Sequence, residues 1–147
     1  MVKKILVATG GSPWSERAVN YAIQFARNYQ AELVFLCVVT PEFIAKKAAA
    51  WGIASASDIE EVKKKEGEEI LNRVCLQARE NGVTYQPHLC VCGQPAAQEI
   101  VQTAREYNCD FIVIGSRGTN RRGERITLHK IGNEVIEKAH CPVMVVK

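Results

Sequence analysis

The sequence lacks the features that mark membrane, secreted or multidomain proteins. Its 147 residues contain no apolar run close to the ~20 residues that a membrane-spanning helix needs. The first residues, MVKKILVATGGS, lack the long apolar core of a secretory signal, so we expect a cytoplasmic protein that binds no membrane. The chain has no linker, low-complexity tract or internal repeat, which predicts a single domain over residues 1–147.

An excess of one charge is also missing, since 19 Lys and Arg against 16 Asp and Glu give a net charge of +3. Residues 117–130 are the exception, because their only acidic residue is Glu124. The cationic residues there are Arg117, Arg121, Arg122, Arg125 and Lys130. This local charge predicts one anion-binding site rather than the broad basic surface of a nucleic-acid-binding protein. The alternative interpretation is a solvent-exposed loop face.

Paired metal-binding motifs are absent although six cysteines occur, at positions 37, 75, 90, 92, 109 and 141. In a cytoplasmic protein we expect reduced thiols, and most of these cysteines lie in apolar runs typical of core side chains. Cys90 and Cys92 share one face of a strand with His88. A metal site needs further ligands at a Cys/His spacing that the sequence does not contain, so we expect no metal.

Short apolar runs alternate with helical patterns along the chain. Strands are expected at residues 3–9, 32–39, 84–91, 110–115 and in the closing VMVVK. Helices are expected after the Ser12-Pro13 cap, and over about 57–81, 95–107 and 127–139, with a basic loop over 116–126. We expect residues 40–57, which include Trp51, to form a loop or a short helix. This alternation is typical of an α/β fold with an open parallel sheet and helices on both faces.

Two glycine-bearing turns follow the first and fourth expected strands. They are Thr9-Gly10-Gly11-Ser12 and Gly115-Ser116-Arg117-Gly118. In such sheets ligands bind beyond the carboxyl ends of the strands, where the strand order reverses. Glycines there let an anion approach helix N-terminal N–H groups, which carry partial positive charge. Together the turns predict an anion or nucleotide site, although each glycine alone is also typical of a tight turn.

At these residues the chain resembles the universal stress protein family over nearly its whole length. The matching blocks are KILVATGGSPWSERAVNYAIQFA, Gly93-Gln94-Pro95-Ala96 followed by Ile100, AREYNCDFIVIGSRG and VIEKAHCPVMVVK. The resemblance implies a Rossmann-like, open five-stranded parallel sheet in the order 3-2-1-4-5. It also implies a homodimer formed through the last strand, with Val143, Met144, Val145 and Val146 at the contact.

Family members divide into ATP binders and non-binders, and the binders carry G-x-x-G-x9-G-(S/T) after the fourth strand. Gly115 and Gly118 fit the first half, but the tenth position after Gly118 is Leu128. Alignment from the closing block places His129-Lys130 at the second half, with one residue inserted, and Gly132-Asn133 comes about one turn too late. A side chain then stands where N–H groups meet phosphate, although Lys130, Arg121 or Arg125 could supply charged contacts instead.

The family's binders also carry an aspartate where this chain has Gly10, and they contact adenine through the backbone near Val38. If a nucleotide binds, the resemblance implies a set of contacts divided between nucleoside and phosphates. The nucleoside residues are Thr9, Gly10, Ser12 and Val38; the phosphate residues are Gly115, Arg117, Gly118, His129 and Lys130. The cofactor implied is ATP, with Mg²⁺ only if ATP binds.

Three functions remain open from the sequence. The first is a non-enzymatic stress-response regulator that binds an adenine nucleotide. The second is a dimeric interaction module without nucleotide, whose basic loop docks an unidentified protein. The third is an ATP-hydrolysing or ATP pyrophosphatase-like enzyme, which would need a base and carboxylates for Mg²⁺. Asp110 stands at the wrong end of its strand and His129 is the only candidate base, so we expect no catalytic residues.

Overall fold

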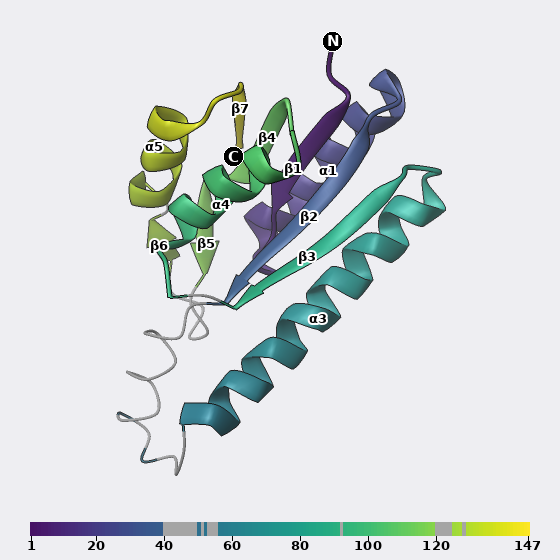
Figure 1. Cartoon of the computed structure of the whole chain (residues 1–147). Helices are drawn as coiled ribbons and strands as arrows, with labels where there is room; N and C mark the ends of the chain where they lie inside the picture. The colour runs from purple at the N-terminus through teal and green to yellow at the C-terminus, as the bar shows by residue number, and fades with distance from the viewer. Residues whose placement is uncertain (40–49, 51, 53–55, 92, 120–124, 128) are drawn as a thin grey trace.

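A five-stranded parallel sheet forms the centre of the computed structural model, which describes residues 1–39, 50, 52, 56–91, 93–119, 125–127 and 129–147 (Figure 1). The strands are β1 (Lys4–Ala8), β2 (Glu32–Val39), β3 (Tyr85–Val91), β4 (Phe111–Gly115) and β7 (Val143–Val146). Their order is β3-β2-β1-β4-β7, and each adjacent pair is parallel. The order implied by the resemblance and the expected strand positions are confirmed.

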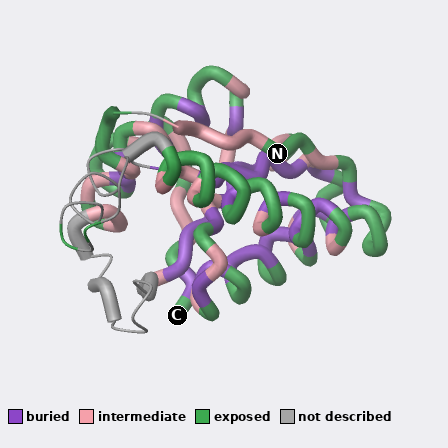
Figure 2. The backbone as a smooth tube through the Cα atoms, turned by 90° about the horizontal axis from the view of Figure 1, so that it is seen from below, coloured by how far each residue is buried: buried purple, intermediate pink, exposed green. Residues whose placement is uncertain are grey.

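Helices cover both faces of this sheet. They are α1 (Pro13–Tyr29), α3 (Ala56–Glu80), α4 (Ala96–Glu106) and α5 (His129–Lys138). The α1 and α3 helices pack on one apolar cluster, whereas α4 and α5 pack on another. Successive strand residues alternate between the two clusters, so Ile5 and Val7 face α1 while Leu6 faces α4. Figure 2 shows buried residues in the interior and exposed residues along the outer sides of the helices.

The first helix begins where the sequence predicts. Ser12 is its N-cap, and Pro13 follows in the first turn, where a missing N–H leaves no helical hydrogen bond unmade. At the opposite end of the sheet, Asp110 precedes β4 and accepts hydrogen bonds from the backbone N–H groups of Lys3 and Lys4, at 2.8 and 3.3 Å. Asp110 therefore anchors the amino-terminal end of β1, far from the carboxyl ends of the strands.

The prediction of a basic loop over residues 116–126 is wrong, because two short strands form there. Residues Arg117–Thr119 (β5) and Arg125–Thr127 (β6) pair as an antiparallel ribbon, with Gly118 opposite Ile126. The β-branched residues of these two short segments favour strands, and glycine and arginine had dominated the loop prediction. The last expected helix consequently begins at His129 rather than near residue 127. Arg121 and Arg122 lie outside the described residues.

Other sequence expectations fall partly outside the described residues. Trp51 and most of residues 40–57 lie there, as does Cys92. Within the described ranges, no helix is long and apolar enough to cross a membrane.

Most of the described cysteines are core side chains, as expected. Cys37, Cys75 and Cys109 are buried, whereas Cys90 and Cys141 are half-buried. Burial raises the pKa of the Cys37 thiol to about 11 and that of Cys109 to about 12. Both thiols are therefore protonated at neutral pH, which suits a packing role. No group of three metal-ligating side chains occurs in the described part of the chain.

Gly115 permits a close approach between the end of β4 and the first turn of α1. A Cβ atom at this position would lie 2.9 Å from the carbonyl carbon of Trp14, 3.0 Å from its oxygen and 3.1 Å from the nitrogen of Ser15. Because these neighbours are backbone atoms, they cannot rotate away. The glycine is thus required for packing, whatever it contributes to a ligand.

We therefore expect Gly115→Ala to lower the free energy of unfolding by about 1–3 kcal/mol, the usual cost of overpacking. Chemical denaturation would measure it. Gly93→Ala is the matched control, since a Cβ at Gly93 meets nothing within 4 Å, and it should leave stability unchanged. Equal stability of the two variants would contradict the packing role of Gly115.

Candidate functional site

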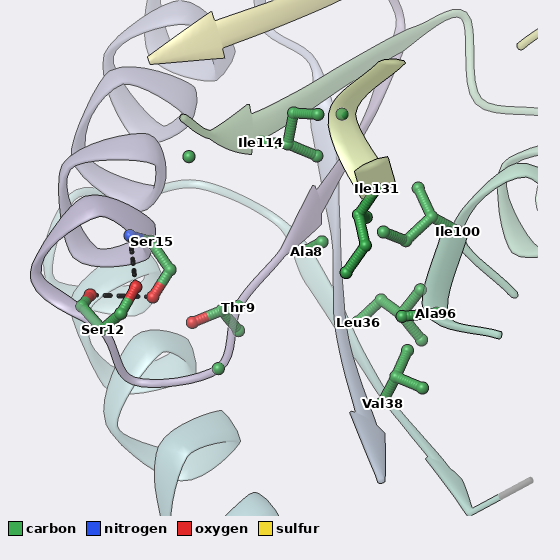
Figure 3. A pocket seen from close by; sticks show the side chains of 13 residues that line it. Ala8, Thr9, Ser12, Ser15, Leu36, Val38, Ala96, Ile100, Ile114 and Ile131 are labelled. Carbon is green, nitrogen blue, oxygen red and sulfur yellow. Dashed lines mark hydrogen bonds between the residues drawn. The ribbon is translucent and has the colours of Figure 1, made fainter. Parts of the chain in front are cut away.

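A cavity of about 190 Å³ lies beyond the carboxyl ends of β1, β2 and β4 (Figure 3). It borders the point at which the strand order reverses, between β1 and β4, which is where open α/β sheets bind ligands. Its lining is Ala8, Thr9, Gly10, Ser12, Ser15, Leu36, Val38, Ala96, Ile100, Ile114, Gly115, Ile131 and Gly132.

The walls of the cavity divide into an apolar side and a hydroxyl-bearing side. Leu36 and Val38 from β2 approach Ile100 from α4 and Ile131 from α5, while the hydroxyl groups come from the turn after β1 and from the first turn of α1 (Figure 3). An apolar slot with a few fixed polar groups at one edge is the usual form of a small-molecule site. The arrangement suits a flat ring that carries hydrogen-bonding groups on its rim.

Three helices begin beside this cavity. Ser12 and Ser15 belong to the start of α1, Ala96 is the first residue of α4, and Gly132 lies in the first turns of α5. The α4 helix has no side-chain cap, and the N–H groups of Gln98 and Glu99 donate to the carbonyl oxygen of Pro95. Among the described residues, the N–H groups of Ala96 and Ala97 are left for other acceptors. Because helix N-termini carry partial positive charge, they favour a ligand with acceptor atoms or negative charge near the cavity.

The hydroxyl groups of Ser12 and Ser15 are engaged within the α1 cap. Ser12 Oγ accepts from the backbone N–H of Ser15 at 3.1 Å, and Ser15 Oγ donates to the carbonyl oxygen of Ser12 at 2.8 Å. Both residues are buried, so these bonds stabilise the helix start. The two serines consequently shape the cavity wall more than they offer unused polar atoms.

Thr9 differs, because its buried hydroxyl oxygen has no hydrogen-bond partner among the described residues. The residue is only 5% exposed, and its backbone N–H donates to the carbonyl oxygen of Leu36 at 2.8 Å, which fixes its position. Figure 3 shows the side chain at the end of β1, with its hydroxyl toward the first turn of α1. A buried hydroxyl without a partner costs about 1–3 kcal/mol. An unpaired group in a cavity wall indicates a position where a ligand supplies the missing bond.

The described lining of the cavity contains no titratable side chain. General acid–base catalysis and Mg²⁺ coordination by protein both need such groups. Asp110, the nearest aspartate considered from the sequence, is held at the amino-terminal end of β1. The hydroxyl groups of Thr9, Ser12 and Ser15 are therefore the polar side-chain groups of this described lining.

The structure brings five of the nine predicted site residues into one cavity wall, namely Thr9, Gly10, Ser12, Val38 and Gly115. Arg117 and Gly118 lie on β5, and His129 and Lys130 begin α5, but the placement of their side chains is not described. Their assignment to phosphates stays a prediction.

Sequence reasoning missed several lining residues, namely Ser15, Leu36, Ala96, Ile100, Ile114, Ile131 and, as a wall residue, Gly132. The block from Gly93 to Ile100 and the Gly132-Asn133 pair were both noted in the sequence, so a signal for three of them existed. The spacing alone does not show that α4 and α5 start on the same side of the sheet, so it does not place these residues in one cavity.

Comparisons with known proteins identify the family. The profile of the universal stress protein family matches residues 1–147. The chain is similar to universal stress protein MJ0531 of Methanocaldococcus jannaschii, at 36% identity over 100% of this chain and 83% of that protein. It is similar to YxiE of Bacillus subtilis at 34% identity, over 100% of both chains. The chain therefore belongs to the universal stress protein family, which confirms the resemblance.

Solved structures agree with this fold. The structure of the protein MJ0577 superposes with a TM-score of 0.82 at 26% identity, over 100% of this chain and 96% of that one. A universal stress protein from Archaeoglobus fulgidus was solved in complex with dAMP, and superposes at a TM-score of 0.69 with 24% identity over 100% and 98% of the two chains. One from Arabidopsis thaliana was solved with AMP bound, with a TM-score of 0.68 and 21% identity over 99% and 91%.

The unpaired hydroxyl of Thr9 makes a prediction about stability. Thr9→Val removes the hydroxyl but keeps the shape, so the free energy of unfolding of the ligand-free protein should rise by about 1 kcal/mol. Ser15→Ala, which removes a hydroxyl that has a partner, should lower it by about 1 kcal/mol. Denaturant titration of both variants measures the two signs. A loss of stability in Thr9→Val would show that its hydroxyl is satisfied in the ligand-free protein.

Proposed function

We propose that this member of the universal stress protein family is a non-enzymatic stress-response protein that binds an adenine nucleotide in the cavity at the end of β1. The observation that carries the proposal is the buried, unpartnered hydroxyl of Thr9 in an otherwise apolar wall. A nucleobase has an apolar face for the isoleucine and valine walls and polar atoms on its rim for this hydroxyl. The dAMP and AMP complexes of the two related folds agree with this choice.

The size of the cavity supports a base as the buried part of the ligand. Sites for complete small-molecule ligands usually measure ~300–1,000 Å³, so about 190 Å³ accommodates only part of a nucleotide. The sugar and phosphates would then lie outside, where α1, α4 and α5 begin. We propose that Val38 borders the base and that the segment from Gly115 through Gly118 to Lys130 borders the phosphates.

ATP is the nucleotide we propose, with Mg²⁺ bound through its phosphates rather than through protein carboxylates. The charge required for a triphosphate is available in the 117–130 segment, which has a net charge of +4. We propose binding without turnover, and the described lining, which holds no acid or base, supports this. In such a protein, the fraction of molecules with ATP bound would change with the ATP concentration.

Calorimetry with ATP and Mg²⁺, after chromatography of the nucleotides released on denaturing freshly purified protein, tests the proposal. We expect adenine nucleotide in the supernatant and micromolar affinity in the stripped protein. Gly132→Leu should weaken binding at least tenfold, because a Cβ at Gly132 meets only Ile114, at 3.9 Å, and a larger side chain extends into the cavity.

Asn133→Leu is the matched control, since Asn133 is the exposed neighbour of Gly132 on the same helix. It should bind ATP as tightly as the unchanged protein. A nucleotide-free supernatant together with no heat up to millimolar ATP would reject nucleotide binding. The interaction-module function would then take its place.

We further propose that the protein forms a homodimer through β7. This strand is one edge of the sheet, and its outer side has no partner strand among the described residues. Val145 on β7 is 40% exposed, and Ile136 on the neighbouring α5 is 54% exposed. The opposite edge, β3, carries Pro87 at its middle, which interrupts a hydrogen-bonding edge. The β7 edge is therefore better suited than the β3 edge to pair with a second chain.

Val145→Lys should shift the protein from dimer to monomer in sedimentation velocity, because a charged side chain on an edge strand opposes pairing. Leu76→Lys is the control, since Leu76 is similarly exposed (52%) but lies on α3. It should leave the sedimentation coefficient unchanged. A monomer for the unchanged protein, or a dimer for Val145→Lys, would contradict β7 as the contact.

A further inference from the structure

A second recess adjoins the cavity at the turn between β1 and α1. It has a volume of about 270 Å³ and is lined by Gly10, Gly11, Glu66, Glu69, Ile70 and Arg73. Four of these residues come from α3, which does not line the cavity described above. Gly10 lines both hollows, so a residue without a side chain stands at their common border.

The space over this turn is open at Gly10 and closely bounded by α3 at Gly11. A Cβ atom at Gly10 would meet nothing within 4 Å. At Gly11, whose φ is +81°, a Cβ atom would lie 3.1 Å from Ile70 Cδ1 and 3.9 Å from Arg73 Nη2. A ligand group that leaves the cavity across Gly10 therefore comes next to the side chains of α3.

The charges of the recess favour a neutral hydrogen-bond donor over a phosphate. Two carboxylates and one guanidinium line it, which gives a net charge of −1. Arg73 pairs with Glu16 at 3.7 Å, and Glu66 pairs with Lys63 at 3.8 Å. Glu69 is exposed and makes no ion pair with any described residue. Its carboxylate is an acceptor that a ligand hydroxyl can use.

We infer that the α3 recess recognises the sugar of a nucleoside whose base occupies the cavity, with Glu69 accepting a hydrogen bond from a sugar hydroxyl across Gly10. The cavity is too small for base and sugar together, and Gly10 leaves the path between the two hollows open. The negative recess turns phosphates away from α3 and so orients the nucleotide. This inference rests on the proposed nucleotide binding and adds the residue that selects nucleosides over free bases.

Calorimetry with adenosine and with adenine tests this role of Glu69. Glu69→Ala should weaken adenosine binding about tenfold, as expected for loss of a hydrogen bond to a charged acceptor, and leave adenine binding unchanged. Glu68→Ala is the matched control, because Glu68 is the exposed neighbour on α3 that does not line the recess. It should bind both compounds like the unchanged protein.

A second variant separates a direct contact from a general effect on α3. Adding Gly10→Asp to Glu69→Ala places a carboxylate at the border of the two hollows, where a side chain has room, and should restore most of the adenosine affinity. Equal adenosine affinity in the unchanged protein and in Glu69→Ala would overturn the inference while nucleotide binding stands. Binding of neither adenosine nor ATP by the unchanged protein would overturn both.

Discussion

The site depends on the central position of β1 in a parallel sheet. Parallel pairing with β2 and β4 places the carboxyl ends of three strands at one edge, and α1, α4 and α5 begin beside that edge. The chain leaves β1 for α1 on one face of the sheet, and it leaves β4 for α5 on the other face. A gap therefore opens between the segments that follow these two strands. The cavity, the three helix N-termini and the glycine turn all gather at this gap. A sheet in another strand order would scatter them.

Thr9 is a residue whose buried hydroxyl lowers the stability of the ligand-free protein but can contribute to ligand binding. The backbone of this residue continues the hydrogen bonding of β1 to β2, but its side chain is buried without a partner. Natural cores rarely keep such a group, because an apolar residue of the same shape removes the cost. The cavity beside it is bounded by apolar side chains, which cannot satisfy the hydroxyl. The unpaired hydroxyl lowers the stability of the ligand-free protein, and this loss is offset only when a ligand supplies a hydrogen-bond acceptor or donor.

The sequence predicted the fold closely, because apolar runs of strand length and helix caps are local signals. The bounds of β2, Glu32–Val39, were predicted to the residue, and the start of α1 followed from Ser12-Pro13. The β5–β6 ribbon was missed because three-residue strands are too short for a periodic pattern to show. Helix starts at residues 96 and 129 were placed within about two residues, which is the usual uncertainty at helix ends.

The candidate site was predictable only in part. The glycine turns located Thr9, Gly10 and Gly115, but the role of Gly115 changed, since the structure gives it a packing contact with the backbone of Trp14. An unpaired hydroxyl cannot be recognised from a sequence, because it depends on every neighbour in space. The same holds for α3, which follows β2 in the chain but packs on the turn after β1.

The most direct test of the central claim is a titration of isotope-labelled protein with AMP, followed by NMR. The account predicts that the largest amide shifts occur at Thr9, Gly10, Val38, Ala96 and Gly132, which come from four separate segments of the chain and line the same cavity. Shifts confined to the basic residues 117–130, or no shifts at millimolar AMP, would contradict it. The first result would show surface attraction of an anion, and the second a cavity that holds no adenine nucleotide.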